Sequence, residues 1–84
     1  MRTQTADDQA FLAELSRRVR LNRRYQGLTQ QQVGDRAGLS RSCVAVFEAG
    51  RGSIEVVTLS RIAQALDLSL PALVDIRPDG KEPS

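Results

Sequence analysis

The sequence predicts a small all-α domain built from five short helices. At 84 residues, the chain is long enough to bury one modest core and nothing larger. Hydrophobic residues make up 40% of the chain but aromatic residues only 4%, which favours a helical bundle built on Leu, Val, Ile and Ala. Apolar residues recur at spacings of three and four, and Gly or Pro interrupts this pattern repeatedly.

The first helix is expected to begin at Asp7 and Asp8, because acidic groups favour the positive end of the helix dipole. It runs to about Gln26, and Gly27 stops it. Its buried stripe is apolar and consists of Leu12, Leu15 and Val19. Residues 1–6, which precede it, are predicted to form a flexible N-terminal arm.

The second helix is predicted over about Gln30–Ala37. Thr29 can cap its start, and Gln32 follows three residues later, which makes a capping box. Val33 and Ala37 lie one helical turn apart, so we expect both to face inward.

The segment after this helix carries the signals of a tight turn into a third helix. Gly34 has no side chain, which allows the third helix to cross closely. Gly38 ends the second helix, because glycine adopts the left-handed conformation without penalty. Leu39 is the apolar residue that fills the inside of the turn, and Ser40 caps the next helix.

The third helix is expected over about Arg41–Ala49, with Val44 and Phe47 on its inner face. Three other residues then point outward: Arg41, Ser42 and Ala45. Two short helices joined in this way form a helix-turn-helix, whose second helix enters the major groove of DNA. We call this third helix the reading helix.

The fourth helix follows a break at Gly50 and Gly52 and is expected to start near Ser53 or Glu55. Its inward stripe comprises Val56, Leu59, Ile62, Ala63 and Leu66. Residues 67–69 form a turn.

A short fifth helix is marked by Pro71, which a helix tolerates only in its first turn. The helix carries Leu70, Leu73 and Val74. The domain is thus expected to span residues 7–76. Residues 77–84 are polar and rich in Pro and Gly, and we expect them to form a loose tail.

Positive charge is concentrated around the helix pair. Between residues 11 and 61 there are nine arginines and four acidic residues, a balance of +5, whereas residues 62–84 carry −2. Such a distribution is the electrostatic footprint expected of a DNA-binding domain. A solvated basic helix face would look the same by charge alone.

The composition argues against several other classes of protein. Cys43 is the single cysteine and histidine is absent, so the chain cannot form an internal disulfide, a zinc finger or a nucleophile–histidine pair. We expect Cys43 to fill space beside the reading face rather than act as a redox switch. There is no glycine-rich phosphate loop, so nothing indicates an enzyme, a cofactor or a metal. No apolar run could span a membrane or serve as a signal core, so we expect a cytoplasmic protein.

Two charges interrupt the apolar stripes. Arg23 follows Val19 by four residues on the first helix, and Glu48 follows Val44 by four on the third. An unpaired buried charge is very costly, so each residue implies the other as its partner. The alternative is that both charges lie at a solvated rim.

The stretch V-R-L-N-R-R-Y-Q-G-L-T-Q-Q-Q-V-G-D-R-A-G-L-S-R-S, followed by F-E-A-G-R and T-L-S-R-I-A-Q-A-L, resembles the lambda-repressor-like helix-turn-helix family, also called the Xre or Cro/C1 type. The resemblance runs from Leu15 to Leu73, about seven tenths of the chain. It implies a five-helix fold with the third helix as the reading helix. Family members commonly pair Arg and Glu at the positions of Arg23 and Glu48.

The resemblance also implies roles for individual residues. Gln30 would contact a phosphate and brace the reading helix, and Thr29 and Arg51 would contact the DNA backbone. The positions that reach base edges are held by Arg41 and Ser42, and the next outward positions by Ala45 and Val46, where a small or apolar side chain can meet a thymine methyl. Four residues depart from the family's usual types and leave the operator sequence open: Gly34, Val46, Ala49 and Ile54.

The resulting hypothesis is a sequence-specific DNA-binding transcriptional regulator that binds a palindromic double-stranded operator as a homodimer. Its dimer interface would comprise Leu70, Leu73, Val74 and Ile76, of which the first two would be partly core. These residues could equally just close the core. The alternative function is an antitoxin that binds a toxin protein and regulates its own operon, and a third is a DNA-binding fragment of a larger regulator.

Overall fold

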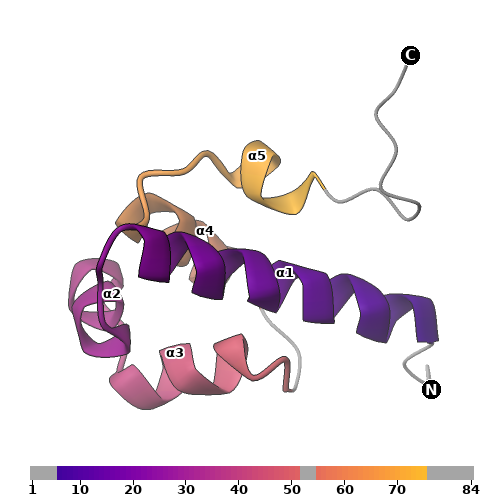
Figure 1. Ribbon diagram of the computed structural model, residues 1–84, viewed down its shortest axis with the longest axis horizontal. Helices are drawn as coiled ribbons and strands as arrows, with labels where there is room; N and C mark the ends of the chain where they lie inside the picture. Colours follow the sequence, from indigo (N-terminus) through magenta and orange to yellow (C-terminus); the bar gives the residue numbers. More distant parts are fainter. Residues whose placement is uncertain (1–5, 52–54, 76–84) are drawn as a thin grey trace.

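The computed structural model describes residues 6–51 and 55–75, and every regular element of secondary structure among these residues is a helix. The five helices are α1 (Ala6–Tyr25), α2 (Gln30–Ala37), α3 (Arg41–Glu48), α4 (Val56–Ala65) and α5 (Leu70–Val74) (Figure 1). The predicted all-α, five-helix fold is therefore confirmed.

Several helix boundaries differ from the prediction by a residue or two. Ala6, which the prediction placed in the N-terminal arm of residues 1–6, belongs to α1. Helix α3 ends at Glu48 rather than Ala49, which is its C-cap. The remainder of that arm, Ile76 and the predicted tail lie outside the described residues.

The residues predicted to cap the two ends of α2 do so in the structure. The backbone N–H of Gln32 donates to Thr29 Oγ1 over 3.0 Å, and the backbone N–H of Thr29 donates to Gln32 Oε1 over 2.8 Å. These two bonds form the predicted capping box. At the other end, Gly38 has φ of 71°, the left-handed conformation that ends the helix.

The turn between α2 and α3 comes very close to Gly34. A Cβ atom at this position would lie 2.6 Å from the carbonyl oxygen of Leu39, which is well inside contact distance. The backbone N–H of Leu39 donates to the carbonyl of Gly34 over 2.8 Å and holds the turn there. Beyond the turn, Ser40 Oγ accepts from the N–H of Cys43 and caps α3, as predicted.

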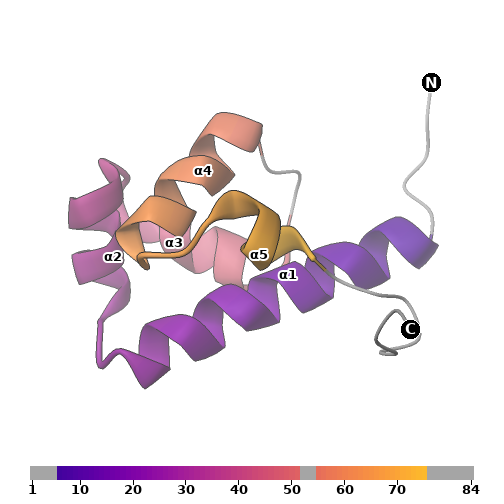
Figure 2. The ribbon, with the colours of Figure 1, turned by 90° about the horizontal axis from the view of Figure 1, so that it is seen from above.

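The long helix α1 runs across the middle of the molecule (Figure 1). In that view α3 forms the lower edge, α5 lies above α1, and α2 closes one end. Figure 2, seen from above, shows α4 on the far side of the domain from α1, with α5 between them. Helices α3 and α5 thus lie at opposite edges of the domain.

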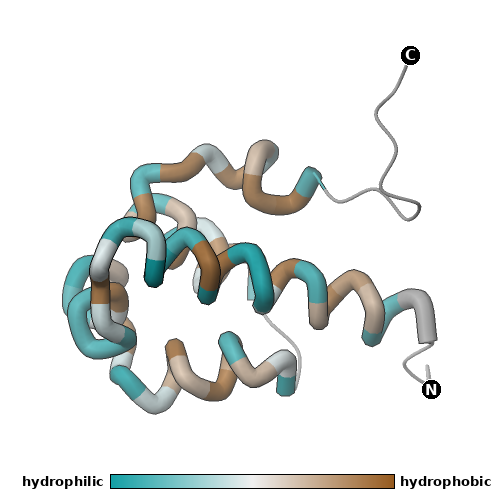
Figure 3. The backbone as a smooth tube through the Cα atoms, viewed as in Figure 1, coloured by the Kyte–Doolittle hydropathy of each residue, from teal (hydrophilic) through white to brown (hydrophobic). Residues whose placement is uncertain are grey.

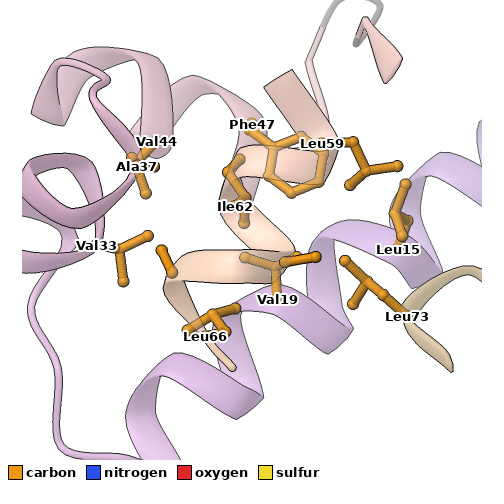
Figure 4. Packing of buried hydrophobic residues seen from close by; sticks show 12 residues of the cluster. Leu15, Val19, Val33, Ala37, Val44, Phe47, Leu59, Ile62, Leu66 and Leu73 are labelled. Carbon is orange, nitrogen blue, oxygen red and sulfur yellow. The ribbon is translucent and has the colours of Figure 1, made fainter. Parts of the chain in front are cut away.

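The core is a single apolar cluster to which every helix contributes. Figure 4 shows Phe47 of α3 beside Leu59 and Ile62 of α4, and Val44 of α3 beside Ala37 of α2. The reading helix is therefore anchored through its inner face to both α2 and α4.

Along α1, polar and apolar positions alternate in patches, as in an amphipathic helix (Figure 3).

The prediction that Val56 belongs to the buried stripe of α4 is wrong. Helix α4 starts at Val56, whose side chain is 70% exposed, and the stripe begins one turn later at Leu59. Among the described residues none buries Val56 or Val57 at this turn, so helical spacing alone does not make a core position there. Leu66 is buried as predicted, although it is the C-cap of α4.

Candidate nucleic-acid interface

Helix α3 presents two contrasting faces. Val44 and Phe47 are buried, while Arg41, Ser42 and Val46 are exposed and Ala45 is half-buried. The residues suggested for base contacts therefore lie away from the core, on the outer side of a helix at the edge of the domain. This arrangement leaves one face of α3 free to enter a groove of matching width.

The start of α2 lies next to the end of α3. Gln30 is half-buried, and its Nε2 donates to Glu48 Oε1 over 3.2 Å. Thr29 is exposed, and its hydroxyl accepts the N–H of Gln32, which leaves the hydroxyl proton available to another acceptor. The second N–H of the Gln30 amide and this hydroxyl are both suited to a phosphate oxygen.

Arg23 and Glu48, the two charges predicted to pair, form an ion pair between α1 and α3. Arg23 Nε lies 2.7 Å from Glu48 Oε2, and Nη2 lies 2.9 Å from Oε1. The side chains are 11% and 3% exposed. A third donor, Nη1, bonds the carbonyl of Leu28 at 2.9 Å. Hydrogen bonding to Glu48 raises the pKa of Arg23 above its ordinary value even though burial opposes this.

A second arginine of α1 also reaches the end of α3. Arg20 Nη1 donates to the backbone carbonyl of Glu48 over 3.0 Å. This contact is not among those predicted from the sequence. Helical spacing could have shown that Arg20 and Arg23 share a face of α1, but a backbone acceptor leaves no signal in the sequence.

The arginines of the described residues divide into two groups. Several are engaged within the domain: Arg17 and Arg18 with Glu14, Arg36 with the carbonyl of Ala65, and Arg20 and Arg23 with Glu48. The side chains of the rest make no hydrogen bond or ion pair with another described residue: Arg24, Arg41, Arg51 and Arg61. Two of these flank the reading helix, so positive charge is available at both of its ends.

An open groove runs between α3 and the start of α4. Its polar lining includes Ser42, Arg51 and Thr58, and its apolar lining includes Val46 and Phe47. Cys43 is a half-buried free thiol in the same lining. The groove adjoins the outer face of α3, so it extends the candidate nucleic-acid surface.

Residues 6–51 and 55–75 hold no cluster of three His, Cys, Asp or Glu side chains arranged for a metal ion. None of their helices combines the length and the apolar character needed to cross a bilayer.

The residues suggested for the dimer interface fall into different environments. Leu73 is 2% exposed, so it belongs to the core of the single chain. Leu70 and Val74 are half-buried at the edge of that core. Ile76 lies outside the described residues. Leu70 and Val74 are therefore the two described members of the set that retain accessible surface.

A helix-turn-helix with a free outer face defines a class of DNA-binding protein, and the comparisons with known proteins agree. Residues 14–75 match the helix-turn-helix domain family. The match covers most of the chain, so the chain belongs to this family of DNA-binding transcriptional regulators, and the lambda-repressor-like class inferred from the sequence is confirmed.

Two curated relatives share this segment. An uncharacterised helix-turn-helix-type transcriptional regulator, y4dJ of Sinorhizobium fredii, is 44% identical over 52 residues, which cover 62% of this chain and 68% of the relative. A second uncharacterised regulator of the same type, from Methanothermobacter thermautotrophicus, is 38% identical over 48 residues, which cover 57% of this chain and 70% of the relative.

Solved structures show the same fold. The restriction-modification controller protein C.AhdI from Aeromonas hydrophila is 33% identical, with a TM-score of 0.73 over 76% of this chain and 97% of its own. A hypothetical transcription factor, NHTF from Neisseria, is 26% identical, with a TM-score of 0.75 over 94% of this chain and 90% of its own.

Proposed function

We propose that this protein is a sequence-specific transcriptional regulator that binds a palindromic DNA operator as a homodimer, with α3 in the major groove. The observation that carries the proposal is the outer face of α3. Arg41 and Ser42 are exposed there, and the guanidinium of Arg41 has no partner among the described residues. A charged, unengaged side chain on the free face of a well-anchored helix is suited to reading bases.

The chemistry of the individual side chains supports different contacts. Arg41 can donate two hydrogen bonds to a guanine, and Ser42 can bond either a donor or an acceptor. Ala45 and Val46 supply an apolar surface for a thymine methyl. Phosphates would be bound near the C-terminal end of α3, by Thr29 and Gln30 at the start of α2 and by Arg51 just beyond α3.

The proposal of a dimer rests on the size of the reading helix. One helix of eight residues contacts too few bases for useful specificity, so two copies should bind two half-sites. Half-site centres should then lie about 34 Å apart or a multiple of that distance. Similarity to a restriction-modification controller protein favours a regulator of this small type.

Selection of bound DNA from a random pool tests the proposal. The expected result is a palindromic consensus, protected by the protein as two half-sites. Arg41→Ala should lose the preference for it, whereas Arg61→Ala, which removes an exposed arginine on α4, should keep it. Recovery of no preferred sequence, or of one asymmetric half-site protected at saturation, would contradict this function.

A further inference from the structure

The last turn of α3 depends on a donor from another helix. The final four carbonyl groups of any helix lack helical donors. In α3 the backbone N–H groups of residues 49–51 donate to the carbonyls of residues 45–47. The carbonyl of Glu48 accepts instead from Arg20 Nη1 on α1, at 3.0 Å.

The charge of this donor suits its position. The C-terminal end of a helix carries partial negative charge, which a cation stabilises. Helix α3 has no basic residue in its own last turn. Arg20 supplies the missing cation from α1, and its half-buried position limits competition from water.

Arg20 and Arg23 hold different parts of the same residue. Arg23 binds the carboxylate of Glu48 with two donors, while Arg20 binds the backbone carbonyl. A carboxylate can swivel about its side-chain torsions, so the ion pair alone leaves the helix axis some freedom. The bond from Arg20 acts on the backbone of the helix directly, without an intervening torsion of Glu48.

We propose that Arg20 is a positioning residue for DNA reading, which locks the C-terminal end of α3 and thereby sets how the helix enters the groove. This inference rests on the proposed function, since it concerns the same helix. Fixing both backbone and side chain of Glu48 keeps the outer face in one orientation. Small displacements of recognition groups are costly, so loss of the lock should reduce specific binding more than non-specific binding.

A competing role for Arg20 is direct contact with a phosphate. A phosphate contact is lost equally on every DNA sequence and lowers the slope of log affinity against log salt by about one. A positioning role leaves the salt slope unchanged and lowers the affinity for the selected site alone. The two roles therefore differ in quantities that one titration series can measure.

The experiment uses Arg20→Met, which keeps the apolar stem of the side chain and removes its donors, and Arg20→Lys, which keeps a charge and a donor. The matched control is Arg17→Met. Arg17 is exposed on the same helix and pairs with Glu14 at 3.3 Å rather than with Glu48. Each variant is measured by hydrogen exchange in the free protein and by binding to selected and random DNA.

In the free protein, Arg20→Met should speed exchange of the amides of Ala49 and Gly50 on the order of tenfold, the scale of one hydrogen bond to a charged group. Arg20→Lys and Arg17→Met should stay near wild type. Unchanged exchange in Arg20→Met would overturn the proposal. The exchange measurement needs no DNA. It therefore decides whether Arg20 holds the C-terminal end of α3 even if the wild-type protein selects no sequence and the proposed function fails.

On DNA, Arg20→Met should weaken binding to the selected site on the order of tenfold and leave binding to random DNA within about twofold. Arg20→Lys should recover most of the affinity. Equal losses on both DNAs, with a lower salt slope, would overturn the proposal and make Arg20 a phosphate contact.

Discussion

The guanidinium of Arg23 and the carboxylate of Glu48 form a bidentate ion pair, with Nε to Oε2 at 2.7 Å and Nη2 to Oε1 at 2.9 Å. The pair joins α1 to the last residue of the reading helix. Gln30 donates to the same carboxylate from the start of α2. The ends of three helices are thus held at one buried point.

Truncating either member of this pair should strongly destabilise the fold. Arg23→Ala or Glu48→Ala leaves the other charge buried without its partner, at a cost of about 3–5 kcal/mol. Urea unfolding of the single variants measures this. Replacing both residues by methionine should recover part of the loss, because it removes both charges together.

The pairing of Glu14 with Arg17 and Arg18 provides the control. Those contacts are longer, at 3.3 and 3.5 Å, and the side chain of Glu14 is 35% exposed, compared with 3% for Glu48. Glu14→Ala should cost no more than about 1 kcal/mol. If Glu48→Ala were as mild as Glu14→Ala, the pair would contribute little to stability.

Gly34→Ala should destabilise the protein even though alanine favours helices. Alanine gains about 1 kcal/mol of helix propensity over glycine. Its Cβ would lie 2.6 Å from the Leu39 carbonyl oxygen, which is backbone and cannot simply rotate away. The turn into α3 must shift, so we expect a net loss of about 1–3 kcal/mol by urea unfolding.

Gly38→Ala separates crowding from backbone strain. Gly38 has φ of 71°, and a Cβ there meets nothing within 4 Å. This variant should lose about 1–2 kcal/mol from strain alone and leave operator affinity unchanged. Gly34→Ala should lower operator affinity as well, because α3 moves. A Gly34→Ala protein as stable as wild type would show that the turn relaxes freely.

Arg41→Ala should cost about 1–3 kcal/mol of binding to the selected operator and much less on random DNA. The reason is that a two-pronged contact to guanine depends on sequence, whereas a phosphate contact does not. Competition binding with both DNAs measures the two losses. Equal losses of affinity for both DNAs would show that Arg41 contacts a phosphate instead of a base.

The sequence predicted those features that depend on local chemistry or on strict helical spacing. Thr29, Gly38 and Ser40 cap their helices as expected because capping requires only neighbouring residues. Arg23 and Glu48 were found because each continues an apolar stripe, where a charge demands a partner.

What the sequence did not reveal depends on tertiary arrangement. Val56 has the spacing of a core residue, yet its side chain is 70% exposed at the start of α4. Ser16 is buried on α1 because its hydroxyl donates to the carbonyl of Leu12, so a polar residue occupies a core position. The bond from Arg20 ends on a backbone atom that every residue carries.

Dimerisation through α5 is expected to depend on Val74. This residue is half-buried at the edge of the core, so a second copy could cover its remaining surface, whereas Leu73 beside it is already buried within the chain. Val74→Asp should give a folded monomer in sedimentation experiments, because a desolvated charge opposes association. Operator affinity should fall by about 10²-fold or more, since the two half-sites would no longer be bound as one unit.

The apolar residues at the start of α4 offer the matched control for this prediction. Val57 is more exposed than Val74, so Val57→Asp places the same charge on another apolar surface of the domain. It should leave the dimer unchanged. If Val57→Asp gave the monomer and Val74→Asp stayed dimeric, the interface would lie at the start of α4. Circular dichroism of both variants confirms that any loss of the dimer occurs in a folded protein.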